Sequence, residues 1–171
     1  MFVEVSDIFR KKNYGDDYYN LVYTWIVSAL SDFNPNNIKF AFIENDKQVL
    51  DPISKLLTDI SPNLMYDSIA STKDDTNKLL YLINEEKKER LSTLRSMYCT
   101  SIEEYNLKNA RNPMDYICLV INGYPDLIAD NYSLNNLKEI IENSARAGMF
   151  VIVLGQNRSD NRNIDNILDL D

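Results

Sequence analysis

The segment that most constrains the fold is the apolar run from Cys118 to Ile121, which leads directly into the polar pair Asn122-Gly123. A short unbroken apolar run bounded by a turn is typical of a strand that is buried on both faces. Such a strand needs a layer of helices on each side of the sheet. The run therefore predicts an α/β protein with a parallel central sheet.

The remaining hydrophobic patterns support the same architecture. Apolar runs predict strands at 38–43, 116–121 and 149–154, with shorter candidates at 2–5 and 64–66. Helical periodicity predicts helices at 18–30, 49–57, 71–97, 101–106 and 133–147, the last one ending at Gly148. The charge run 85–90 is expected to be a solvated helix face. Because helices and strands alternate, the functional loops are expected at the carboxyl ends of the strands.

Composition limits the classes of function. The chain has 171 residues, which is enough for one domain, expected to cover 1–171 either alone or as a piece of a larger protein. Its net charge of −8 argues against a broad nucleic-acid interface, which requires a basic face. The absence of histidine excludes Ser-His, Cys-His and His-ligated metal sites. No apolar run approaches the roughly 20 residues of a membrane-spanning helix, so no direct membrane contact by this chain is expected.

Four stretches, taken in order, carry a family resemblance. They are 38–47, then 85–90 with 102–106, then 119–128, and finally 145–158, where a helix end, a glycine, an apolar strand and Gln-x-Arg follow one another. In order and spacing they resemble the RecA-like motor domain of the FtsK/SpoIIIE family. The resemblance implies a P-loop NTPase-like three-layer sandwich with a mostly parallel sheet.

The position that corresponds to the family's phosphate-binding loop departs from the motif. A P-loop needs several glycines, a lysine for the β- and γ-phosphates and a Ser or Thr for Mg²⁺. The candidate segment, expected just before the first helix, is Gly15-Asp16-Asp17-Tyr18-Tyr19. Tyr18 and Tyr19 stand where Lys and Ser/Thr are needed, and two aspartates stand where a phosphate would lie. The same two aspartates also suit a plain helix cap, because carboxylates favour a helix N-terminus.

The position that corresponds to the Walker B strand end has also lost its acids. In the family an Asp there holds the magnesium shell and a Glu orients the attacking water. This chain has Asn122 and Gly123 instead, although Asp126 keeps the tail of the motif. Both motifs are therefore degenerate, and the resemblance implies a pseudo-ATPase with no catalytic residue and no metal site.

Three further residues have family counterparts. Gln156 occupies the position of a sensor for the γ-phosphate, and Arg146 and Arg158 are candidates for arginines that act across a subunit interface. Each has a simpler interpretation. Gln156 can bond a neighbouring loop at a strand end, and the arginines can form surface salt bridges.

An acidic module with altered Walker motifs is most similar to a C-terminal ATPase module of the EssC/YukB-type motors of type VII secretion. That resemblance implies a structural, regulatory or substrate-recognition role, with no cofactor unless ATP and Mg²⁺ bind a site completed from elsewhere. It implies two kinds of partner, namely other FtsK-like domains of the same motor and secreted WXG100-type substrates or their signal sequences, while a homo-oligomer stays open. The expected location is the cytoplasm, at the inner face of the bacterial membrane, within a membrane-anchored protein.

Two alternatives stay open. One is an ATP-binding FtsK-like motor or DNA-translocase domain whose missing groups come from other subunits. The other is a stand-alone α/β binding module without a role in secretion.

Overall fold

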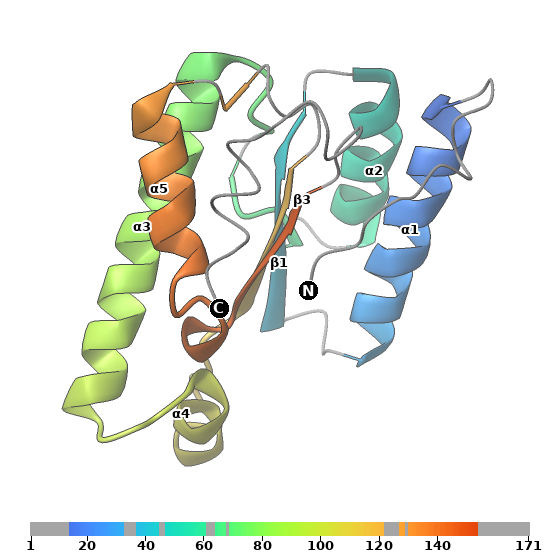
Figure 1. Ribbon diagram of the computed structural model, residues 1–171. Helices are drawn as coiled ribbons and strands as arrows, with labels where there is room; N and C mark the ends of the chain where they lie inside the picture. The colour runs from blue at the N-terminus through green and yellow to red at the C-terminus, as the bar shows by residue number, and fades with distance from the viewer. Residues whose placement is uncertain are drawn as a thin grey trace.

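The computed structural model describes residues 14–32, 37–44, 47–60, 64–67, 69–121, 127–128 and 130–153, and in helix residues 14–22, 47–50, 56 and 60 it describes the backbone alone. Along the chain the elements are α1 (Tyr14–Asp32), β1 (Ile38–Ile43), α2 (Lys47–Ile60), α3 (Lys73–Ser96), α4 (Ile102–Lys108), β2 (Tyr116–Ile121), α5 (Asn131–Ile141), a 3₁₀ turn η4 (Ala145–Ala147) and β3 (Met149–Val153) (Figure 1). The strand predicted at 2–5 lies outside the described residues.

The described strands form a parallel sheet in the order β1-β2-β3. In the register, Ile38 lies opposite Tyr116, and Ile117 lies opposite Met149. The sequence prediction of a parallel sheet is therefore confirmed, and the predicted bounds of β1 and β2 agree with the structure. Among the described strand residues, Lys39 is the one that carries a charge, which is consistent with a sheet covered on both faces.

A short extended segment covers the outer edge of β1. The amide of Tyr66 donates to the carbonyl of Phe40 at 2.9 Å, and the amide of Ala70 donates to that of Phe42 at 3.0 Å. These contacts form isolated parallel bridges at Met65 and Ala70. The strand predicted at 64–66 is thus reduced to a single bridge.

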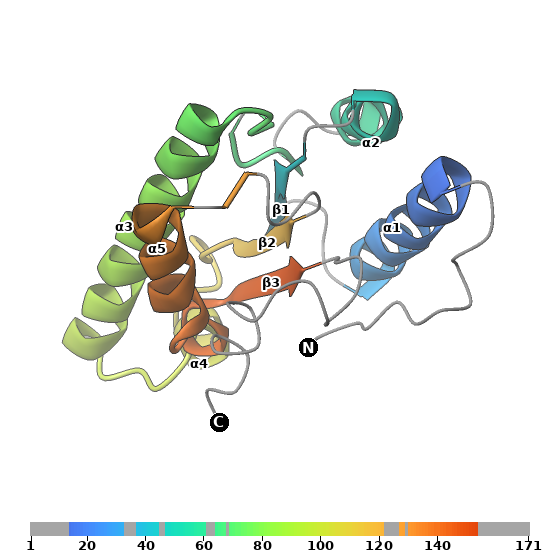
Figure 2. The ribbon, with the colours of Figure 1, turned by 45° about the horizontal axis from the view of Figure 1, so that its top comes forward.

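Helices cover both faces of the sheet, with α1 and α2 on one side and α3 and α5 on the other (Figure 2). Alternation along the strands divides the core accordingly. The α1/α2 side buries Ile26, Phe40, Phe42, Ile53, Leu57, Cys118, Val120 and Ile152. The α3/α5 side buries Ala41, Ile43, Leu79, Leu80, Ile83, Ile117, Leu119, Ile121, Leu137 and Ile140. At about 1.5–3 kcal/mol for each large apolar side chain, burial in these two layers dominates the stability of the fold.

The helix ends follow local chemistry. Thr72 caps α3 by accepting a hydrogen bond from the amide of Asp75 at 3.2 Å, as its Ser/Thr-type start predicts. The helix predicted at 133–147 is shorter than expected, since α5 ends at Ile141 and η4 follows. Gly148 nevertheless adopts the left-handed conformation (φ 69°) expected of a helix-terminating glycine. Among the described helices, none combines the length and apolar character that a membrane span requires.

Candidate functional site

The carboxyl edge of the sheet is where an α/β protein of this kind is expected to bind ligands. The predicted residues Asn122, Gly123, Asp126, Gln156 and Arg158 all lie outside the described residues. Their assignment to a degenerate nucleotide site therefore stays a prediction. The structure does show that the chain leaves the sheet at the end of β2 and returns to the core at Leu127 and Ile128, which are 6% and 1% exposed.

The candidate phosphate-loop segment is helical. The backbone of Gly15, Asp16, Asp17, Tyr18 and Tyr19 forms the first turns of α1, which begins at Tyr14. The expectation that this segment precedes the helix was wrong, because one glycine close to a helix start does not prevent helix formation and acids suit that end. Beyond the first turn, helical amides are already bonded to carbonyls and are not available to a phosphate.

A buried acid lies at this edge. Glu44 directly follows β1 and is only 2% exposed. Because Ile43 lies opposite Ile121 in the register, Glu44 directly follows the strand residue that pairs with the end of β2. Its amide donates to the carbonyl of Ala70 at 2.9 Å, and the residue makes a further interaction within the protein. An acid directly after an apolar run was the sequence signal for this residue.

A seam of polar contacts joins α3 to α5. The side-chain Nδ2 of Asn84 donates to Asn136 Oδ1 at 3.2 Å and to Glu139 Oε2 at 2.6 Å. The bond from Asn84 is the main cause that lowers the pKa of Glu139. One turn further along, Lys87 donates to the carbonyl of Glu142 at 3.3 Å, and burial lowers the pKa of Lys87.

The charge run 85–90 is therefore not a fully solvated face. Lys87 and Arg90 are each 6% exposed. Arg90 donates from Nη1 to the carbonyls of Asp115 and Ala147, and from Nε to Glu86 at 2.8 Å. Backbone carbonyls thus satisfy the buried guanidinium, which joins α3 to the amino ends of β2 and β3. Periodicity alone did not predict this role.

Arg146 lies at the opposite edge of the sheet from the predicted nucleotide site. It belongs to η4, immediately before β3, and its Nε donates to the carbonyl of Thr100 at 2.9 Å. Its side chain is exposed. A role for Arg146 across a subunit interface stays a prediction, but within this chain the residue contacts the α3–α4 turn.

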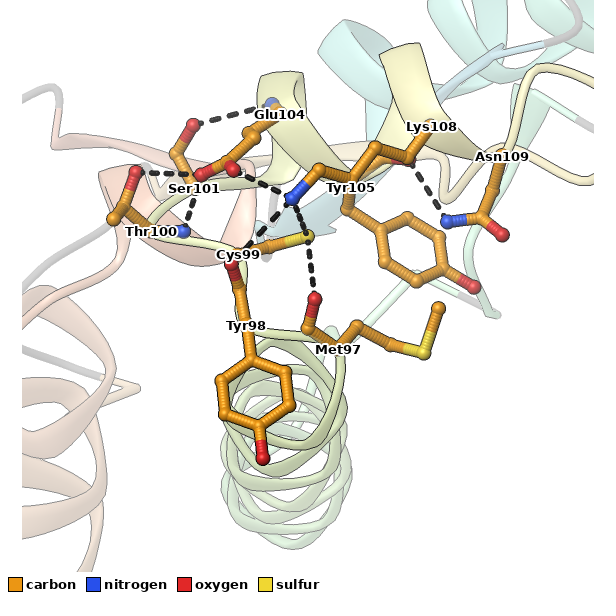
Figure 3. A network of polar contacts seen from close by, with 9 residues as sticks. All are labelled: Met97, Tyr98, Cys99, Thr100, Ser101, Glu104, Tyr105, Lys108 and Asn109. Atoms are coloured by element: carbon orange, nitrogen blue, oxygen red, sulfur yellow. Dashed lines mark hydrogen bonds and ion pairs between the residues drawn. The ribbon is translucent and has the colours of Figure 1, made fainter.

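That turn, residues 97–101, carries a dense polar network (Figure 3). Lys108 donates to Glu104 Oε1 at 2.7 Å and approaches the carbonyl of Tyr98 at 3.5 Å and the sulfur of Cys99 at 3.7 Å. Glu104 also accepts from the amide and hydroxyl of Thr100 at 2.7 and 3.0 Å. The bond from Lys108, followed by those from Thr100, lowers the pKa of Glu104 to about 2.

The described residues contain no group of three or more acidic or cysteine side chains arranged to hold a metal ion. The α3–α5 seam and the α3–α4 turn are two polar assemblies of the described residues. Their contacts hold neighbouring helices in position.

We compared the chain with known protein families, curated proteins and solved structures. No protein-family model matches the sequence, and no curated protein matches it. Among solved structures, the fold is similar to EssC (ATPases 2 and 3) from Geobacillus thermodenitrificans, with a TM-score of 0.67, 15% identity, and coverage of 88% of this chain and 28% of that chain. The chain has the fold of an EssC ATPase module.

The fold is also similar to a second structure, the cytoplasmic domain of EssC. The TM-score is 0.65 at 16% identity, and the match covers 88% of this chain and 29% of that chain. The RecA-like, P-loop NTPase-like three-layer architecture predicted from the sequence is thereby confirmed. The chain spans less than a third of the length of either EssC structure.

Proposed function

We propose that this chain is a catalytically degenerate FtsK/SpoIIIE-like module of a type VII secretion motor. The observation that carries the proposal is a fold shared with EssC ATPase modules combined with a sequence that lacks the residues such a site needs. Without a P-loop lysine and a Walker B Asp-Glu pair, these motif positions lack the groups that neutralise the phosphates and orient water in the family. The chain then contributes by contact with other proteins rather than by turnover.

The partners follow from the same likeness. EssC carries several ATPase modules in one chain, as the name of its structure states. We propose that this module contacts other FtsK-like modules of its motor and secreted WXG100-type proteins or their signal sequences. The module would act at the cytoplasmic face of the membrane as a structural, regulatory or substrate-recognition unit.

A calorimetric titration with ATP and Mg²⁺, together with a phosphate-release assay, tests the degenerate state. We expect no turnover and at most weak binding, because Asp16 and Asp17 repel phosphates. A ligand that binds only the folded state raises the melting temperature by mass action, so a thermal-shift series supplies an independent measurement. Magnesium-dependent turnover that is lost on substitution of Asn122 or Gln156 contradicts the proposal.

One observation favours the alternative of an ATP-binding module completed by other subunits. Glu44 supplies a buried carboxylate beside the strand end that has lost its acids. Carboxylates are ligands for Mg²⁺. If wild-type protein binds Mg-ATP and Glu44→Gln abolishes that binding without lowering the melting temperature, the alternative replaces the degenerate assignment.

A further inference from the structure

Tyr98 combines backbone strain with almost complete exposure. It has a φ of 53°, in the left-handed region that favours glycine, and its side chain is 90% exposed. A left-handed position directly after a helix is normally occupied by glycine. A bulky aromatic residue there costs stability, and an exposed ring regains almost nothing through burial. The protein therefore keeps a tyrosine at a place where its own folding favours glycine.

The surrounding turn fixes the backbone at Tyr98. The amide of Tyr98 donates to the carbonyl of Arg95 at 3.2 Å, and its carbonyl faces Lys108. The next residue, Cys99, donates its amide to the carbonyl of Leu94 at 2.8 Å. In Figure 3 the ring of Tyr98 points away from the network formed by Glu104 and Lys108. Met97, which is 44% exposed, adds apolar surface to the same turn.

The charges around Tyr98 are mainly positive. Arg95 precedes it in the last turn of α3, Lys108 contacts its carbonyl, and Arg146 bonds the carbonyl of Thr100. The acid within this network is Glu104, which is already bonded to Lys108 and Thr100. The other acid of α4, Glu103, interacts with the hydroxyl of Tyr116. Three cations against the two carboxylates of α4 give a local charge of +1, whereas the whole chain carries −8.

From this geometry we infer that the α3–α4 turn is a protein-docking surface on which Tyr98 is the anchor and the surrounding cations select an acidic segment of a partner protein. Tyrosine and arginine are the residue types that most often dominate binding energy at interfaces, when the partner covers the ring and excludes water. Opposite charges at the rim of an interface steer association and reject wrong partners. The occupant is a peptide segment that carries aspartate or glutamate together with aliphatic side chains, which cover the ring. This inference goes beyond the proposed function and does not depend on the state of the nucleotide site.

Fluorescence anisotropy with the intact chain tests the inference. The probe is a labelled twelve-residue peptide with equal numbers of Asp/Glu and Leu/Ile. Its control replaces every acid by lysine. We expect the acidic peptide to bind and the basic peptide not to bind. Failure of the acidic peptide to bind, or equal binding of both peptides, overturns the inference.

The decisive variant is Tyr98→Gly. Glycine suits the left-handed backbone, so the melting temperature is expected to stay unchanged or to rise by a few degrees. Binding of the acidic peptide is expected to fall by about 30-fold, which corresponds to the loss of an interface anchor. Tyr81→Ala removes a different exposed tyrosine of α3, 47% exposed, and is expected to bind like the wild type. Equal binding by Tyr98→Gly, or an equal loss in Tyr81→Ala, contradicts the inference.

Two further measurements test whether charge contributes to peptide binding and whether the surface binds a second copy of this chain. Arg95→Glu is expected to weaken acidic-peptide binding by about tenfold and to reduce its salt dependence, because it reverses a rim charge. Sedimentation of the wild type without peptide is expected to show no species whose formation depends on Tyr98. A dimer that is lost in Tyr98→Gly replaces the acidic partner with a second copy of this chain.

Discussion

The guanidinium of Arg90 in α3 donates a buried hydrogen bond of 3.0 Å to the carbonyl of Ala147, 57 residues further along the chain. A second bond reaches the carbonyl of Asp115, so one side chain fixes the start of β2 and the approach to β3. Lys39 adds an ion pair to the side chain of Asp115 at 2.9 Å. Lys39 thus reinforces the amino edge of the sheet, which the buried cation of Arg90 joins to α3.

Removal of that cation is expected to destabilise the fold strongly. In Arg90→Met two buried carbonyls and Glu86 lose their donor, so the free energy of unfolding should fall by about 3 kcal/mol. Arg95→Met, in the same helix but exposed, should change it by no more than about 0.5 kcal/mol. Urea titration of both variants measures the difference. An equal loss of unfolding free energy in both variants would show that the buried hydrogen bonds of Arg90 do not stabilise the fold more than an exposed arginine does.

Gly148 is expected to tolerate no side chain. Its φ is 69°, and a Cβ built there would overlap the buried side chain of Ile102. Gly148→Ala should therefore lower the free energy of unfolding by about 2 kcal/mol, from backbone strain and overpacking together. The further substitution Ile102→Val should restore the part of the free energy of unfolding that is lost through overpacking, and leave the part lost through backbone strain. Full recovery would mean that the left-handed backbone costs nothing at this position.

The Glu104–Lys108 contact predicts a specific pH dependence. The hydrogen bond from Lys108 lowers the pKa of Glu104 from 4.5 to about 2. Because the pKa of Glu104 is lower in the folded protein than in the unfolded chain, the ionised carboxylate stabilises the fold at pH values above the unfolded-state pKa of 4.5. This stabilisation is lost as the pH falls from about 4.5 to about 2. The difference in melting temperature between wild type and Glu104→Gln should be present above pH 4.5 and should shrink through that window. A difference that does not vary with pH would contradict the prediction.

Cys118 is expected to be unreactive in the folded protein. It is 4% exposed in the centre of β2, and burial raises the pKa of its thiol to about 12. Thiolate is the reactive form, so a thiol reagent should modify Cys118 only in the unfolded chain. The variant Cys99→Ala isolates this measurement. Rapid labelling without denaturant would place Cys118 outside the core.

Restoring the lost acids tests the assignment of the strand end. The double variant Asn122→Asp with Gly123→Glu should cost about 1 kcal/mol or less, because the turn is expected to face the open edge of the sheet. It should still not hydrolyse ATP, since the sequence has no P-loop motif with its lysine. A loss well above about 2 kcal/mol in urea titration would identify Gly123 as a structural glycine instead.

The elements that the sequence predicted best are those defined by long apolar runs. The span 116–121 of β2 agreed with the structure because a strand buried on both faces reads as a nearly continuous apolar run. Helix ends were less predictable. α5 stops at Ile141, and Asn143 two residues later adopts a left-handed conformation. Asn tolerates that conformation and is a known helix-terminating residue, a stop signal that apolar periodicity does not contain.

The polar features were the least predictable. Periodicity places Lys87 and Arg90 in a charge run, and it does not show that backbone carbonyls from β2, η4 and the end of α5 satisfy their head groups. The strained backbone of Tyr98 likewise has no local sequence signal, because it arises where α3 must turn into α4. For the nucleotide site, the family resemblance supplied residue assignments that the described part of the chain leaves as predictions.

The register of the sheet also determines how the chain can acquire its structure. Ile38 must find Tyr116, with α2, α3 and α4 in between, before the first two strands can pair. Closing so long a loop costs entropy before any strand contact compensates for it, and such non-local topologies fold slowly. β2 and β3, with only α5 and η4 between them, can associate sooner. Assembly is therefore expected to begin in the carboxyl-terminal half, with β1 joining last.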